Sequence, residues 1–119
     1  MSPLVAKESD ALKFWEDYAR CNYGIFWHVR DARGQNVEGM PDVLMVLPKW
    51  DGSSVLVALE IKCRRDRLRS AQREAVFALG AVAGSVVGVV RYGKKRDISP
   101  LVEMTQDEAV SAIEQALGG

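Results

Sequence analysis

Gly39-Met40-Pro41-Asp42 stands directly before an apolar run at 43–47, and a second run at 55–62 ends in Glu60-Ile61-Lys62. The residues between the two runs, 48–54, are typical of a turn. The pattern predicts an antiparallel hairpin, because both runs have the apolar, β-branched content of buried strands. A hairpin returns the end of the second strand to the start of the first. We therefore expect two carboxylates and one ammonium group to lie close together.

The chemistry of these three groups suits a divalent cation and a phosphate. Side chains alternate between the two faces of a strand, so Glu60 and Lys62 share a face. Magnesium prefers oxygen ligands and takes one or two carboxylates from a protein, which predicts Asp42, Glu60 and the Ile61 carbonyl as ligands. Lys62 would orient the attacking water or stabilise the developing oxyanion. The alternative is an ordinary surface ion pair, which Glu-x-Lys on an edge strand commonly forms.

These motifs resemble those of a known nuclease superfamily. Gly39-x-Pro41-Asp42, Glu60-x-Lys62 and Gln72 together resemble the PD-(D/E)xK nucleases, and specifically the small VRR-NUC branch, which is similar to Holliday junction resolvases. In that branch the Glu-x-Lys strand is followed by a basic, serine-containing turn and a helix that carries a Gln. The stretch Arg67-Leu68-Arg69-Ser70-Ala71-Gln72 fits this description, and the resemblance covers residues 8–91.

The resemblance implies a helix, three strands, a helix and a further strand as the core. It also implies Mg²⁺-dependent hydrolysis of DNA phosphodiester bonds that leaves 5′-phosphate and 3′-hydroxyl ends, often on branched DNA such as junctions or flaps. Mn²⁺ is expected to replace Mg²⁺. One difference from the branch is Tyr92, which follows Val89-Val90-Arg91 where a second Arg is expected.

Two further residues receive roles from position and resemblance together. Gln72 lies on the same flank of its predicted helix as Val76 and Leu79, so its amide should point towards the strand ends. There it would hold the attacking water or bond a phosphate; the alternative is a solvated side chain. Glu8 lies on the flank of the first helix's apolar stripe, where an auxiliary metal or water ligand is expected. The alternative for Glu8 is an ion pair with Lys7 or another basic side chain.

Charge distribution favours a nucleic-acid partner although the formal net charge is zero. Basic residues concentrate in one cluster after the Glu-x-Lys strand and another after the last predicted strand, while acidic residues concentrate in the first and last helices. Such a basic face suits phosphate contacts; solvated loops are the alternative. The predicted nucleic-acid-binding residues are Arg30, Arg33, Arg64, Arg65, Arg67, Arg69, Arg91, Lys94 and Lys95.

The rest of the chain predicts an α/β scaffold. Helices are expected from Ser2-Pro3 to near residue 22, from a Ser70 cap to about residue 82, and from the capping box at 105–108 to residue 117. Strands are expected at 25–30 and 86–91 besides the hairpin, the last one parallel to the third. The expected fold is a single restriction-endonuclease-like domain over 1–119, with an αβββαβ core, a mixed four-stranded sheet and an extra C-terminal helix.

Composition fits one small folded domain. The chain has 119 residues, of which 48% are hydrophobic and 27% charged, and it has no long apolar run or signal-peptide pattern, so a cytoplasmic location is expected. Cys21 and Cys63 have no zinc spacing and are expected to be buried free thiols. His28, the single histidine, is interpreted as structural. A homodimer is expected, because paired sites suit junction cleavage.

We therefore expect a metal-dependent, structure-directed DNA endonuclease. A different class of function stays open: a nucleic-acid-binding module on the same scaffold without turnover. A hydrolase of small phosphoesters is disfavoured, because a compact substrate needs no extended basic face.

Overall fold

The computed structural model describes residues 8–30, 32–35, 39–63, 68–93, 97–98 and 101–118. Along the chain the elements are α1 (Glu8–Cys21), β1 (Ile25–His28), β2 (Val43–Pro48), β3 (Ser54–Cys63), α2 (Ser70–Gly80), β4 (Val86–Tyr92), β5 (Asp97–Ile98), β6 (Leu101–Met104) and α3 (Gln106–Ala116). None of the helices in these ranges is long and apolar enough to cross a membrane.

The strands form one mixed sheet in the order β1-β2-β3-β4-β6, and the two-residue β5 lies beside β6 at its edge. β2 runs antiparallel to both of its neighbours, β1 and β3, which confirms the predicted hairpin, with Val43 opposite Leu59. β4 is parallel to β3, as predicted for a helical crossover through α2, and β6 is parallel to β4. This register places Asp42, which directly precedes β2, opposite Glu60 of β3.

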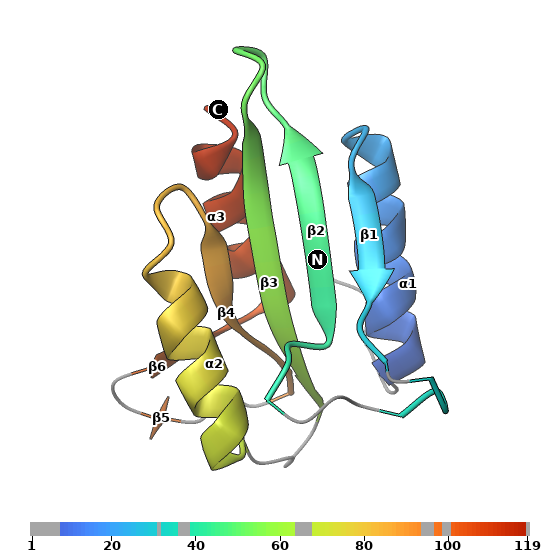
Figure 1. Cartoon of the computed structure of the whole chain (residues 1–119), viewed down its shortest axis with the longest axis vertical. Helices are drawn as coiled ribbons and strands as arrows, with labels where there is room; N and C mark the ends of the chain where they lie inside the picture. Colours follow the sequence, from blue (N-terminus) through green and yellow to red (C-terminus); the bar gives the residue numbers. More distant parts are fainter. Residues whose placement is uncertain are drawn as a thin grey trace.

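The helices cover the two faces of the sheet unequally. In Figure 1, α1 and α3 lie behind the sheet and α2 lies in front of it, beside β3 and β4. The main core lies on the side of α1 and α3, where Trp15, Met45, Leu59 and Ile113 are fully buried. The opposite face carries the even-numbered residues of β3, among them Glu60 and Lys62.

The prediction of a four-stranded sheet is incomplete, because β5 and β6 extend it beyond β4. β6 was missed because Glu103 interrupts its short apolar pattern. That carboxylate is tolerated inside the sheet because Arg91 donates to Glu103 Oε2 through Nε at 3.1 Å and Nη2 at 2.7 Å. Both side chains are 0% exposed.

Helix boundaries correct two further expectations. Ser70 is the first helical residue of α2, and Arg69 occupies the N-cap position in extended conformation. α2 ends at Gly80, short of the predicted end. For α3 the predicted capping box is confirmed, since Thr105 Oγ1 accepts from the Glu108 N–H at 3.1 Å. The predicted start of α1 at Ser2-Pro3 lies outside the described residues.

Cys21 and Cys63 are not joined in a disulfide, as expected, but the predicted burial is wrong for Cys21, which is exposed. It lies in the last turn of α1, on the side that faces solvent. Cys63 is partly buried at the end of β3.

Candidate active site

Glu60 and Gln72 join β3 to the first turn of α2. Gln72 Nε2 donates to Glu60 Oε1 at 2.8 Å, and both residues are buried. The other end of the amide caps its own helix, because Gln72 Oε1 accepts from the Arg69 N–H at 2.9 Å. The amide points towards the strand ends, as the helical spacing predicts. The amide orients the Glu60 carboxyl group through this hydrogen bond. The role predicted for it, to hold the attacking water, would have required an amide without such a protein partner.

Asp42 reaches the same point from the start of β2. Its Oδ2 accepts from the Ile61 N–H at 2.8 Å, a contact between residues that are 19 apart in sequence. This bond ties the Pro-Asp turn to the strand that carries Glu60 and Lys62. The Ile61 carbonyl stays a predicted ligand, since the described contact of this residue is made by its N–H.

Lys62 lies on the same face as Glu60, as strand alternation predicts. Its Nζ is 3.9 Å from Glu60 Oε1, and its side chain is 10% exposed. An ammonium group so well buried needs compensating charge. Among the described residues, Lys62 forms this ion pair at a separation near the upper limit for such a contact. The interpretation as a solvated surface ion pair is therefore wrong, because the pair is buried.

Burial dominates the electrostatics of the carboxylates. It raises the pKa of Glu60 from 4.5 to about 9, and the neighbouring Asp42 carboxylate adds to this rise through charge repulsion. Lys62 and Arg69 act in the opposite direction. Glu60 Oε2 is buried and has no hydrogen-bond partner among the described residues.

These residues fit a hard divalent cation in chemistry, with a small ligand set. Among the described residues, no three or more His, Cys, Asp or Glu side chains are gathered for metal binding. Magnesium does not require such a group, because it keeps several waters and takes one or two carboxylates. The buried, unpartnered Glu60 oxygen beside Asp42 is an atom that a cation would satisfy.

Glu8 lies near the site but is separated from it by an arginine. Arg30 Nη2 is 3.7 Å from Glu8 Oε1, and Arg30 Nη1 is 3.8 Å from Asp42 Oδ1. The guanidinium thus links the first turn of α1 to the Pro-Asp turn. The alternative interpretation of Glu8, an ion pair with a basic side chain, describes this contact, and a direct metal contact of Glu8 stays a prediction.

The placement of Arg30 was not anticipated. It was predicted to bind nucleic acid, yet no local pattern showed that it would approach Asp42. The signal is in the topology, because β1 is antiparallel to β2 and the Val29 N–H donates to the Asp42 carbonyl at 2.9 Å. The residue after Val29 therefore lies beside the Pro-Asp turn.

His28 is partly buried near the same turn. Burial and the charge of Arg30 lower its pKa, and its Nε2 has no hydrogen-bond partner among the described residues. The imidazole is therefore neutral at neutral pH. A neutral ring packed on the α1 side of β1 fits the structural role interpreted from the sequence.

The predicted phosphate contacts have three different outcomes. Arg33 and Arg69 are exposed, and Arg30 lies at the site. Arg91 is the correction: its guanidinium is 0% exposed and bound to Glu103, so it is a buried structural cation that phosphate cannot reach. Five predicted contacts from the two basic clusters lie outside the described residues, namely Arg64, Arg65, Arg67, Lys94 and Lys95.

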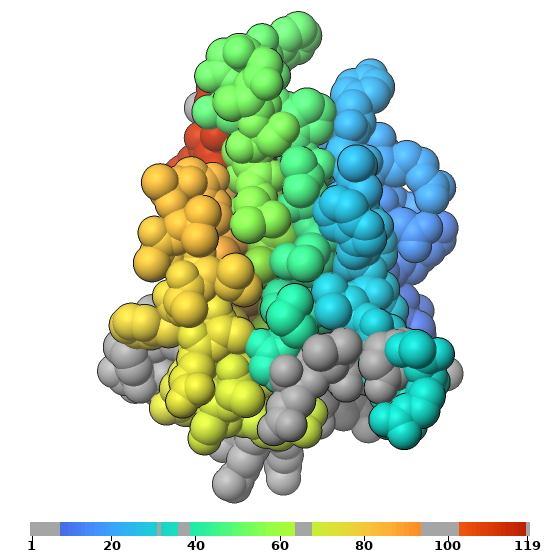
Figure 2. Space-filling view, viewed as in Figure 1, coloured from blue at the N-terminus to red at the C-terminus, as the bar shows by residue number. Residues whose placement is uncertain are grey.

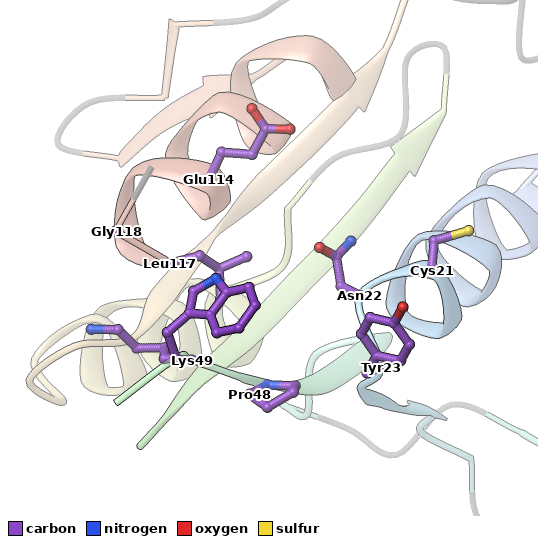
Figure 3. Close-up of a pocket in the computed structure, with 9 residues that line it drawn as sticks. Cys21, Asn22, Tyr23, Pro48, Lys49, Glu114, Leu117 and Gly118 are labelled. Atoms are coloured by element: carbon purple, nitrogen blue, oxygen red, sulfur yellow. The ribbon is translucent and has the colours of Figure 1, made fainter. Parts of the chain in front are cut away.

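A separate cleft lies at the other end of the sheet. It has a volume of about 730 Å³ and is formed by the end of α1, the β2–β3 turn and the end of α3, with Tyr23, Lys49 and Glu114 among its lining residues (Figure 3). Asp42, Glu60 and Lys62 are not among the residues that line this cleft. The candidate site is thus defined by buried polar groups and lies apart from this cleft.

Scans against protein-family models, curated proteins and solved structures found no match to this chain. The function is therefore inferred from the residues of the site itself.

Proposed function

We propose that the protein is a metal-dependent nuclease that hydrolyses DNA phosphodiester bonds. The observation that carries this proposal is the buried carboxylate pair, Asp42 and Glu60, with an unpartnered oxygen and a buried ammonium group beside it. An interior that existed only to be stable would not retain such a pair without compensation. A buried carboxyl group with a raised pKa, such as that of Glu60, marks a candidate functional site.

Each residue has a role that follows from its position. Asp42 and Glu60, with the Ile61 carbonyl, would hold Mg²⁺ or Mn²⁺. A bound ion of this kind lowers the pKa of a water and neutralises charge on phosphate. Lys62 would orient the attacking water and stabilise the developing oxyanion. Gln72 would keep the Glu60 carboxylate in its ligating orientation. Glu8 would contribute indirectly, by holding the Arg30 guanidinium beside Asp42.

The partner is best described as DNA, with the exposed Arg33 and Arg69 as phosphate contacts. A small domain has little surface for reading sequence, so cutting directed by the structure of branched DNA, such as a junction or a flap, is favoured. A homodimer would present two sites to two strands, which paired incision of a four-way junction requires. Light scattering tests this arrangement, since a strict monomer makes no paired symmetric cuts.

The test incubates the protein with end-labelled junction, flap, duplex and single-stranded DNA of one sequence, in Mg²⁺, Mn²⁺ or EDTA. Wild type is expected to cut at least one branched substrate with metal and none with EDTA. Asp42→Asn and Lys62→Ala should each reduce the cutting rate about 100-fold or more while DNA binding is kept. Trp50→Ala is the matched control, because Trp50 is fully exposed on the turn at the opposite end of the sheet.

Two outcomes would contradict the proposal. If Asp42→Asn and Lys62→Ala cut as fast as wild type, the site is wrongly assigned. If wild type binds DNA but cuts none of the substrates with either metal, the alternative of a nucleic-acid-binding module without turnover is correct.

A further inference from the structure

The sheet face that carries the site also carries an apolar surface that none of the helices among the described residues covers. α2 packs on β3 and β4, and α1 and α3 pack on the opposite face. In Figure 2 the side chains of β2 and β3 are open to view between α2 and β1. We call the apolar residues of this open face the apolar strip: Ile25, Trp27, Leu44, Val46 and Leu56.

Register and burial define the strip. Ile25 pairs with Val46 and Val46 with Leu56, which makes one row across three strands. Trp27 pairs with Leu44 in the next row. Leu44, Val46 and Leu56 are partly buried, while Ile25 is 56% and Trp27 47% exposed. The intervening residues of these strands, such as Phe26 and Met45, pack into the core on the other face.

The row of Trp27 and Leu44 leads directly to the candidate site. The next row along the sheet is that of Asp42 and Glu60, two residues further on, which is about 6–7 Å at the rise of a strand. The strip thus begins one row of side chains from the carboxylates. At this end the cationic groups gather: Lys62 and Arg69 act on Glu60, and Arg30 lies beside Asp42.

An apolar, aromatic surface that ends beside cationic side chains is chemically suited to bind a nucleotide. The cations complement a phosphate, and an exposed indole offers a stacking face to a base. In a continuous duplex the base faces are stacked on one another, so only an unpaired or splayed base could occupy the strip. The strip itself contains no charged side chain, which suits the apolar face of a base.

We propose that the apolar strip, with Trp27 as its exposed aromatic, stacks an unpaired nucleobase next to the phosphate held at the candidate site. The inference rests on the proposed function and deepens it, because it specifies the substrate as nucleic acid with an unpaired nucleotide at the cut. A second copy of the chain is the competing occupant of such a surface, and the experiment separates the two.

The binding experiment uses fluorescein-labelled oligothymidylate and a fully paired duplex of equal length, both in EDTA so that no cutting occurs. Trp27→Ala should weaken oligothymidylate binding about tenfold or more, because an aromatic–base stack contributes that much or more to affinity. Trp27→Phe should retain most of the affinity. Trp50→Ala is the matched control and should bind like wild type. Circular dichroism and thermal melts confirm that each variant is folded.

A second readout observes the stack directly. The variant Trp50→Phe retains only Trp15, which is buried, and Trp27. Oligothymidylate should quench its fluorescence, and the paired duplex should not. In the cutting assay, an abasic site at the nucleotide beside the cleaved bond should lower the cutting rate of wild type. It should leave the cutting rate of Trp27→Ala unchanged.

Three results would overturn the inference. They are equal oligothymidylate affinity of wild type and Trp27→Ala, an equal loss of duplex binding in Trp27→Ala, and a dimer that Trp27→Ala converts to monomer without a change in oligothymidylate affinity. Each of these leaves the proposed nuclease function intact if wild type still cuts. Conversely, Trp27-dependent binding without cutting by wild type rejects the nuclease function and retains the stacking surface.

Discussion

Lys62 and Arg91 are paired positions on β3 and β4, yet their surroundings differ sharply. Arg91 is fully buried and makes two hydrogen bonds to Glu103, at 3.1 and 2.7 Å. Lys62 is nearly buried, and its nearest carboxylate oxygen is 3.9 Å away. Beside it, one oxygen of Glu60 has no hydrogen-bond partner in the described part of the chain.

This difference distinguishes charged residues that stabilise the fold from charged residues that are candidates for function. Arg91 and Glu103 satisfy each other, so their burial serves the sheet. The Asp42–Glu60–Lys62 cluster is less well compensated, and the Asp42 carboxylate raises the cost of ionising Glu60. A cation would remove that cost. The comparison therefore predicts opposite responses of the two clusters to mutation, to metal and to pH.

The largest expected effect is on stability, at the satisfied pair. Glu103→Ala leaves Arg91 buried and unpaired, so the free energy of unfolding should fall by about 3–5 kcal/mol in urea titrations. Asp42→Asn should change it far less, because an Asn oxygen can still accept from the Ile61 N–H. The double variant Arg91→Met with Glu103→Leu should recover most of the loss. A greater loss for Asp42→Asn than for Glu103→Ala would reverse the comparison.

A somewhat smaller effect is expected from metal. Mg²⁺ at about 100 times its dissociation constant should stabilise wild type by about 2.7 kcal/mol, because it binds the folded state. Glu60→Gln and Asp42→Asn should lose most of this gain, and EDTA should reverse it. The double variant at Arg91 and Glu103 is the control and should respond like wild type. An equal response in all four proteins would show that the ion binds elsewhere.

Counted per pH unit, the smallest effect is the pH dependence of Glu60. Its pKa is about 9 in the folded protein and 4.5 ordinarily, so between these values the folded protein keeps a proton that the unfolded chain has lost. Without metal, this residue should therefore make stability fall as pH rises from about 4.5 to 9, by at most about 1.4 kcal/mol per pH unit. Glu60→Gln should flatten the fall. Parallel stability curves of the two proteins against pH would refute the raised pKa.

Local patterns predicted much of the fold, because the decisive elements have strong periodicity. The hairpin, the parallel crossover and the capping box of α3 all follow from apolar runs and turn chemistry. β6 could not be predicted in the same way. Its Glu103 breaks a four-residue pattern, and only the three-dimensional structure supplies the partner, Arg91, that makes its burial acceptable.

The site was predictable to a similar degree. Strand alternation placed Glu60 and Lys62 together, and the hairpin brought Asp42 to them. Sequence gave no indication that Gln72 would bind Glu60, or that Arg30 would lie between Glu8 and Asp42. Those contacts depend on where helix ends meet strand ends, which a linear pattern does not record.

Mn²⁺ binding measured by electron paramagnetic resonance tests the central claim most directly, because free Mn²⁺ gives a signal that is lost on binding. The account predicts saturable binding to wild type, competition by Mg²⁺, and at least tenfold weaker binding to Asp42→Asn and Glu60→Gln. Glu103→Gln serves as the matched carboxylate control and should bind like wild type. Equal Mn²⁺ affinity in wild type and both site variants would contradict the account.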